Sequence, residues 1–248
     1  MKKSFAALCL SFFVAGFLHA EVFVDETFDD ASGKVSVKGA LKRANLVVAE
    51  PGQGAIGTDT AAHFLDNSAE ETGVLEYNVD KAGAFLISFD VLNGLPAADS
   101  GYRLIFGMGK ADESKSVKLG PAANRAFSVE LEQVASKGLS LRSGAVAAHK
   151  SAYDGTALQQ VKIWVNDKDT TKLSYIRPDT KVAAQLNPDS VVIWINDKLI
   201  GDELDSGFAM QATVSKGDAE LGRLGFVSKS TDTTDFWIDN MHVESVSP

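Results

Sequence analysis

Short runs of alternating apolar and polar residues recur along most of the chain, interrupted by Gly, Asn, Asp and Pro. A period of two is typical of β-strands that bury one face. Helical periodicity is scarce, and its best candidate, Ala122–Gly138, contains the alternating Phe127, Val129 and Leu131, which favour a strand. The pattern predicts strands at Val22–Phe28, Leu46–Ala49, Ala61–Leu65, Val74–Val79, Ala84–Leu92, Tyr102–Gly107, Ala126–Leu131, Gln159–Val165, Lys172–Ile176, Val191–Ile195, Gly222–Val227 and Asp235–Val243.

Many short strands separated by turns predict antiparallel sheets, because parallel neighbours need a long crossover connection, usually a helix. The economical arrangement is all-β, with two antiparallel sheets packed as a sandwich. No Pro-rich or Ser-rich linker divides the chain, so we expect residues 21–248 to form a single domain. The stretches Glu50–Thr60 and Ser143–Thr156 are expected to be surface loops.

Two similar segments stand near the middle of the chain, QQVKIWVND at Gln159–Asp167 and SVVIWIND at Ser190–Asp197. In each, alternation places aliphatic residues on one face and a tryptophan on the other. Each ends in Asn-Asp, a pair that tolerates the left-handed backbone of a turn. Leu199-Ile200 follows the second copy at once, which predicts a tight hairpin. The predicted aliphatic faces are Val161, Ile163 and Val165, and then Val191, Ile193 and Ile195.

The first residues have the layout of a secretory signal peptide. Lys2 and Lys3 precede an apolar run from Phe5 to Leu18, which closes on the small residue Ala20. We expect residues 1–20 to be removed and the mature protein to be exported, either to the periplasm or out of the cell. The run is shorter than the roughly 20 residues of a membrane span. We therefore expect no membrane span in the mature chain, and an inner-membrane anchor is the alternative.

Cysteine and charge narrow the possible chemistry. The only cysteine, Cys9, lies in the predicted signal peptide, so the mature chain has no thiol for a disulfide, a zinc–thiolate site or nucleophilic catalysis. Removal of Lys2 and Lys3 leaves 22 basic against 33 acidic residues, and 22 − 33 = −11. Such a charge disfavours nucleic acid and anionic lipid as partners. A neutral glycan, a divalent cation or a protein is therefore the expected partner.

The stretch VKIWVNDKDTTKLSYIRPDTKVAAQLNPDSVVIWINDKLIGDE resembles the central hairpins of concanavalin A-like, laminin-G-like jelly-roll domains. ETFDD at Glu26–Asp30 and FWIDNMHVESV at Phe236–Val246 are similar to the first and last strands of secreted bacterial jelly rolls. The resemblance covers most of the mature chain. It implies a concanavalin A-like jelly roll in which the two end strands lie side by side.

That family includes glycosidases, alginate-lyase-like enzymes, lectins and carbohydrate-binding modules, so the fold alone assigns no activity. The Glu-x-Asp-x-x-Glu strand of its glycosidases is absent from this sequence. The lyase motifs R-x-E-x-R and Q-I-H are also missing, although His149, Tyr153 and Arg103 could supply a base and a carboxylate-neutralising group. An exposed loop position is the ordinary alternative for His149. We therefore expect no catalytic residues, with this set as the alternative.

A ligand site is expected around the two tryptophans of the similar segments. The faces of Trp164 and Trp194 could stack on a sugar ring, while Lys162, Asn166 and Asn196 bond its hydroxyls. Burial in the core is the competing interpretation for both tryptophans.

The resemblance also implies a structural calcium ion where the first and last strands meet. Glu26, Asp30 and Asp239 occupy the matching segments, and carboxylate oxygens suit this ion. The alternative is that Asp239 and Asn240 only cap a bulge.

These observations predict an exported, non-catalytic jelly-roll domain that binds a carbohydrate or another cell-surface ligand. A divergent polysaccharide lyase or glycoside hydrolase is the second hypothesis. A structural or adhesive envelope protein without a small ligand is the third.

Overall fold

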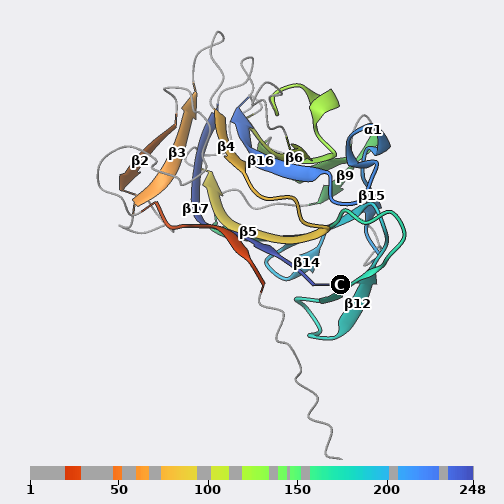
Figure 1. Ribbon diagram of the computed structural model, residues 1–248. Helices are drawn as coiled ribbons and strands as arrows, with labels where there is room; N and C mark the ends of the chain where they lie inside the picture. The colour runs from red at the N-terminus through yellow and green to blue at the C-terminus, as the bar shows by residue number, and fades with distance from the viewer. Residues whose placement is uncertain are drawn as a thin grey trace, which may run out of the picture.

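The computed structural model describes residues 20–28, 47–51, 60–66, 74–93, 102–111, 119–133, 139–143, 146–151, 157–200, 206–228 and 234–247. Strands dominate this part of the chain, together with a 3-10 turn at Ala122–Asn124 and the one-turn helix α1 at Ala212–Ser215 (Figure 1). The strands are β1 (Val22–Glu26), β2 (Val47–Pro51), β3 (Thr60–Asp66), β4 (Val74–Asn78), β5 (Ala84–Asn93), β6 (Tyr102–Lys110), β7 (Phe127–Gln133), β8 (Leu139–Ser143), β9 (Val146–Ser151), β10 (Gln159–Asn166), β11 (Leu173–Ile176), β12 (Ala183–Leu186), β13 (Ser190–Ile195), β14 (Lys198–Leu199), β15 (Phe208–Ala209), β16 (Leu221–Ser228) and β17 (Thr234–Ser245).

The strands form two large sheets and a separate hairpin. The nine-stranded sheet has the order β14-β13-β10-β5-β17-β3-β2, with β1 added to β17 and β15 to β13. The six-stranded sheet has the order β4-β16-β6-β7-β8-β9, and β11 pairs only with β12. Every strand pairing within the described ranges is antiparallel. The prediction of an all-β, two-sheet antiparallel sandwich is confirmed.

The main hydrophobic core lies between the two large sheets. Both aliphatic faces predicted for the similar segments are in it, and Ile163 stands directly opposite Ile193 in the pairing of β10 with β13. Phe89 of the nine-stranded sheet packs edge-on against Phe226 of the six-stranded sheet, with ring centroids 4.9 Å apart, and Phe106 lies 5.1 Å from both. Burying such a side chain contributes about 1.5–3 kcal/mol. Large aromatic side chains therefore join the sheets.

The two Asn-Asp pairs fold differently. Asn196 and Asp197 have φ values of 47° and 60°, which form the tight turn predicted between β13 and β14. Asn166 and Asp167 end β10 without a positive φ, and both are buried. The prediction that each pair marks a strand end is confirmed, but only the second uses the left-handed backbone.

Some strands lie where the sequence predicted none. β9 and the end of β8 fall within Ser143–Thr156, which was expected to be a loop. The prediction is wrong there because the Ala-rich stretch of β9 has weak intrinsic strand preference and owes its conformation to pairing with β8. β12 was missed for the same reason. It pairs with β11 and places Leu186 in a buried position.

The two ends of the described chain meet in the nine-stranded sheet. β1 pairs antiparallel with β17, with Val24 opposite Val243 and Glu26 opposite Met241. The side-by-side arrangement of the first and last strands is thereby confirmed. All of the predicted signal peptide except Ala20 lies outside the described residues. A search of the described residues for a helix long and apolar enough to span a membrane finds none.

Candidate functional site

The outer face of the nine-stranded sheet, which points away from the other sheet, is polar in its middle and apolar at both ends. On β5 the outward positions run Leu86, Ser88, Asp90 and Leu92, so two polar residues lie between two apolar ones. Because outward positions alternate along a strand, this pattern belongs to one face.

The neighbouring strands repeat this pattern. On β10 the order is Trp164, Lys162 and Gln160, and Leu158 follows beyond the strand. On β17, which runs antiparallel to β5, the same spatial order is His242, Asp239 and the buried Trp237. A bulge between Asp239 and His242 shifts the register and keeps both residues opposite outward positions of β5. The polar residues thus form one continuous band.

Strand register aligns the band across the sheet. Lys162 stands opposite Ser88, Ser88 opposite His242, and His242 opposite Asp25 of β1. In the next row Gln160 stands opposite Asp90. Asp25 and Gln160 are exposed and the others are half-buried. We call this band the polar strip, and its members are Asp25, Ser88, Asp90, Gln160, Lys162 and His242.

Hydrogen-bonding groups crowd the strip. His242 Nδ1 lies 3.4 Å from Asp25 Oδ1, and His242 Nε2 lies 3.5 Å from Glu244 Oε2. Asn240 Nδ2 donates to Asp90 Oδ2 over 2.8 Å. The strip therefore presents carboxylates, an imidazole and amides on a surface that water reaches. Such groups can bind a polyhydroxylated ligand.

The hairpin of β11 and β12 bounds one side of the strip and covers the two tryptophans predicted to bind the ligand. Trp164 is 8% exposed and Trp194 1%, and both pack in a cluster with Leu173, Tyr175 and Leu186. Tyr175 and Trp164 have ring centroids 5.1 Å apart. Both tryptophans are on the predicted outer face of the sheet, but neither has an open ring face for a sugar. Both tryptophans are therefore buried in a hydrophobic cluster, as the competing interpretation expected.

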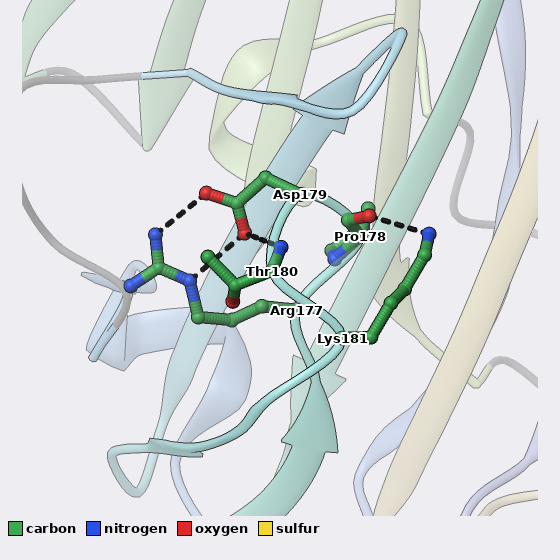
Figure 2. Close-up of polar contacts among 5 residues, drawn as sticks. All are labelled: Arg177, Pro178, Asp179, Thr180 and Lys181. Carbon is green, nitrogen blue, oxygen red and sulfur yellow. Dashed lines mark hydrogen bonds and ion pairs between the residues drawn. The ribbon is translucent and has the colours of Figure 1, made fainter.

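The tip of this hairpin is a turn held by its own side chains (Figure 2). Arg177 Nη2 donates to Asp179 Oδ2 over 2.8 Å, and Arg177 Nε donates to Asp179 Oδ1 over 3.1 Å. These bonds from Arg177 lower the pKa of Asp179 to about 2. The guanidinium carbon of Arg177 also lies 5.5 Å from the ring centroid of Trp194. Arg177 thus connects the turn to the covered tryptophan.

The opposite side of the strip is bounded by a second aromatic cluster. His63 stacks on Trp237 with centroids 3.9 Å apart and planes 5° apart. His63 Nε2 lies 2.7 Å from Asp235 Oδ1, and both residues are buried. Leu92 and Leu158 pack against the same tryptophan. Apolar groups therefore flank the strip on two sides.

The predicted ligand-binding residues have separate positions. Lys162 belongs to the polar strip. Asn196 is exposed at the end of the polar strip, where Asn196 Oδ1 accepts from Gln160 N over 2.8 Å. Asn166 is 1% exposed, and its Nδ2 donates to the Thr171 carbonyl over 2.8 Å, which is a structural task. The structure thus brings Lys162 and Asn196 near one surface and places Asn166 in the interior.

The predicted metal ligands are only partly described. Glu26 ends β1, and its Oε1 accepts from Phe28 N over 2.8 Å. Asp239 is 8% exposed, and its Oδ1 accepts from Asn240 N over 2.7 Å at the bulge of β17. Asp30 lies outside the described residues. No group of three or more His, Cys, Asp or Glu side chains within the described ranges is arranged to hold a metal ion.

The residues of the catalytic alternative fall on or near the six-stranded sheet. Arg103 stands opposite Glu132 in the pairing of β6 with β7. His149 of β9 stands opposite Leu141 of β8. β7 and β8 separate these two strands. Tyr153 lies outside the described residues. The structure therefore places only two of the three residues, on strands that are not neighbours.

The outer face of the six-stranded sheet carries buried charges that the sequence did not reveal. Arg223 Nη2 donates to Glu76 Oε2 over 2.6 Å, and the two side chains are 3% and 4% exposed. Glu76 Oε1 also accepts from Leu119 N over 2.8 Å. The side chain of Arg125 lies directly over Gly107, where a Cβ would leave it no room. This charged layer is covered, in contrast to the polar strip.

Sequence reasoning missed most of the polar strip. Ser88 and Asp90 are the signal that could have found it, because they interrupt the apolar outward positions of β5. Their partner His242 belongs to the last strand of the chain. Only strand register places it beside Ser88, and the sequence does not specify that register.

Comparison with known proteins shows similarity at the level of structure. Neither the protein-family models nor the curated proteins give a match. The chain is similar to a carbohydrate esterase from Shiga toxin-encoding bacteriophage phi24B, with a TM-score of 0.55, 17% identity and coverage of 92% of this chain and 100% of the other. It is also similar to the carbohydrate recognition domain of Emp47p, with a TM-score of 0.53, 11% identity and coverage of 90% and 96%.

A sialidase gives a TM-score of 0.54 at 12% identity over 92% of this chain, and the chain spans 19% of the length of that enzyme. At such identities the likeness shows the fold. The protein has the concanavalin A-like jelly-roll fold that its sequence predicted.

Proposed function

We propose that the protein is exported and binds a neutral glycan chain along the polar strip, without cleaving it. The observation that carries this proposal is the continuous polar band between two aromatic clusters. Its carboxylates and amides are partners for sugar hydroxyls, and its members stand on adjoining strands. The row that begins at Lys162 and ends at Asp25 crosses four strands spaced about 4.8 Å apart, and so extends about 14 Å. That length suits a short oligosaccharide lying across the strands.

Charge supports a neutral ligand. Asp25 and Asp90 contribute carboxylates to the strip, and Asp239 adds one at its edge, against the single ammonium of Lys162. The whole chain has a formal charge of −9. An anionic glycan would meet repulsion both from the site and from the surrounding surface. The esterase and the recognition domain are carbohydrate-directed by name, which agrees with this ligand class.

Binding to immobilised and free neutral oligosaccharides tests the proposal. We expect the double variant Gln160→Ala, Lys162→Ala to bind at least tenfold more weakly, a loss of about 1.4 kcal/mol, because it removes hydrogen-bonding groups from the middle of the strip. The matched control is Gln185→Ala, Lys172→Ala, which changes exposed residues of the same types on the hairpin. Calorimetric titration measures both. Absence of binding to a broad panel of neutral glycans, or equal losses in the two variants, would contradict the assignment.

We further propose that Glu26, Asp30 and Asp239 hold one calcium ion at the junction of the end strands. Glu26 lies opposite Met241, two residues beyond Asp239 on β17, so two of the three carboxylates come from adjoining strands. Calcium prefers such oxygen ligands. When bound, the ion would neutralise acidic groups and fasten β1 to β17.

Thermal unfolding with calcium and with a chelator tests this ion. We expect calcium to raise the melting temperature of the natural protein, because a ligand that binds only the folded state stabilises it. The variant Asp239→Asn should lose the response. A melting temperature that is the same under both conditions removes the proposal.

A divergent polysaccharide lyase or glycoside hydrolase is the alternative to binding alone, with His149, Tyr153 and Arg103 as its candidate residues. Incubation with neutral and uronate-containing polysaccharides, followed by assays for new reducing ends and unsaturated products, separates this candidate from binding alone. Neither binding nor product formation would leave the structural or adhesive alternative.

A further inference from the structure

An acidic junction lies at one end of the sandwich, away from the polar strip. Asp167 follows β10, and Asp189 precedes β13 with a φ of 46°. Asp218 and Glu220 belong to the segment that leads into β16. Asp169 joins them from the turn after β10. These segments come from both large sheets, so the junction connects the sheets.

Asp167 is the centre of this junction. Its backbone N–H donates to the Gly83 carbonyl over 2.9 Å, and its own carbonyl accepts from Ala219 N over 2.9 Å. Its Oδ2 accepts from Leu221 N, the first residue of β16, over 2.8 Å. The side chain of the residue that follows β10 of the nine-stranded sheet therefore holds the start of β16 in the six-stranded sheet.

A second set of bonds runs beside the first. Asp169 N donates to Asp218 Oδ1 over 2.7 Å, and Gly217 N donates to Asp169 Oδ1 over 3.2 Å. Asp189 N donates to the Lys168 carbonyl over 3.1 Å. Several carboxylates are thereby fixed within one small region.

Two carboxylate oxygens in the junction have no hydrogen-bond partner. Asp167 is 0% exposed, and its Oδ1 is buried without a partner. The Oδ1 of Asp189 is buried in the same way. A buried, ionised carboxylate with an unsatisfied oxygen is costly, so such groups are paired or take up a proton.

We propose that Asp167 takes up a proton from solvent on its buried Oδ1, and that this proton fastens the two sheets at this end of the sandwich. A proton on Asp167 Oδ1 gives that oxygen a hydrogen to donate and removes a negative charge from the acidic junction. Asp167 Oδ2 continues to accept from Leu221 N. The junction is then a clamp that closes in acid and loosens as the proton leaves.

The electrostatic surroundings support this assignment. Burial raises the pKa of Asp167 to about 7, and the charges of Asp189 and Glu220 add to this, against hydrogen bonds from backbone N–H groups that lower it. Burial, Asp169 and Asp218 raise the pKa of Asp189 as well.

Among the described residues, no Lys or Arg side chain forms an ion pair with Asp167 or Asp189. Lys110, at the end of β6, lies 3.7 Å from Glu220 Oε2. The side chain of Lys168 lies over Gly83, at the start of β5. Asp167 therefore depends on a proton for its missing counter-charge.

The sign of the pH dependence follows from the raised pKa. A carboxyl that titrates near 7 when folded and near 3.8 otherwise binds its proton about a thousandfold more tightly in the folded state. The proton therefore stabilises the folded state fully below about pH 4. Above that, the folding constant falls by up to tenfold for each pH unit, and the contribution of the proton is gone above about pH 7. We therefore expect the natural protein to be more stable against unfolding in mildly acidic solution than in alkaline solution.

Urea unfolding at pH 5 and pH 8, together with carboxyl-carbon NMR titration of the natural protein, tests the clamp. We expect the folding constant to fall by up to about a hundredfold between these pH values. Asp167→Asn should remove most of that fall, because its amide imitates the protonated acid. Asp80→Asn, at an exposed position, should retain it.

Each other outcome contradicts the proposal. A stability that is flat between pH 5 and 8, an unchanged fall in Asp167→Asn, or an Asp167 titration near 4 would overturn it. If Asp167→Asn does not fold, the NMR titration of Asp167 in the natural protein decides. A large gain in stability from added calcium at pH 8 that Asp167→Asn abolishes would assign the junction to a cation instead of a proton.

Discussion

The Asn-Asp pairs show how one dipeptide serves two purposes. Asn196 and Asp197 adopt positive φ values and close a hairpin at the surface. Asn166 and Asp167 have no positive φ, and it is their side chains that form the contacts. Asn166 Nδ2 donates to the Thr171 carbonyl, and Asp167 Oδ2 accepts from Leu221 N of the six-stranded sheet. The sequence predicts a strand end in both places. It does not predict the burial of the first pair, because that depends on the segments packed over it.

The tryptophans give a similar lesson about the site. Alternation correctly assigns Trp164 and Trp194 to the face opposite the main core. It does not reveal whether that face is open, because the cover comes from the hairpin between the two strands. Lys162 shares the same face and remains half-buried beyond the hairpin. One of the predicted residues thus belongs to the polar strip while its aromatic neighbours are structural.

The hairpin of β11 and β12 covers the cluster that contains Trp164 and Trp194. Its inward positions complete the second hydrophobic cluster, and Leu186 in that cluster is 0% exposed. We expect Leu186→Ala to destabilise the protein by about 2–5 kcal/mol, because it leaves a cavity against the tryptophans. The adjacent Gln185 points outward and is exposed, so Gln185→Ala should change stability by less than about 0.5 kcal/mol.

Urea unfolding and tryptophan emission measure this pair of variants. Emission of the folded Leu186→Ala protein should shift to longer wavelength as the rings become more hydrated, while Gln185→Ala leaves it unchanged. Equal stabilities and spectra for the two variants would show that the hairpin does not seal the cluster.

The positions of the strands are easier to predict from the sequence than their pairing. Most strands follow from alternation in their own residues, whereas β9 and β12 depend on pairing with a neighbour. The polar strip is harder still, since it brings His242 within 3.4 Å of Asp25, 217 positions earlier. No local pattern specifies such a contact. The sequence could therefore predict the sandwich and only fragments of the site.

At the scale of the whole molecule, a common core connects two sheets with different outer faces. The nine-stranded sheet offers an open polar strip, and the six-stranded sheet has its charges covered. All three tryptophans of the sequence, Trp164, Trp194 and Trp237, lie on the nine-stranded sheet. Tryptophan fluorescence consequently reports the unfolding of that sheet alone, while circular dichroism reports both.

This separation of signals allows a test of whether the sheets unfold together. Phe226 lies on the six-stranded sheet and packs edge-on against Phe89 across the core. We expect Phe226→Ala to destabilise the protein by about 3–5 kcal/mol. Because the core is shared, the fluorescence and dichroism transitions in urea should move to lower concentration by the same amount, although the six-stranded sheet carries no tryptophan. A fluorescence transition that stays in place while the dichroism transition moves would mean that each sheet is stable without the other, and the acidic junction would then have no joint structure to fasten.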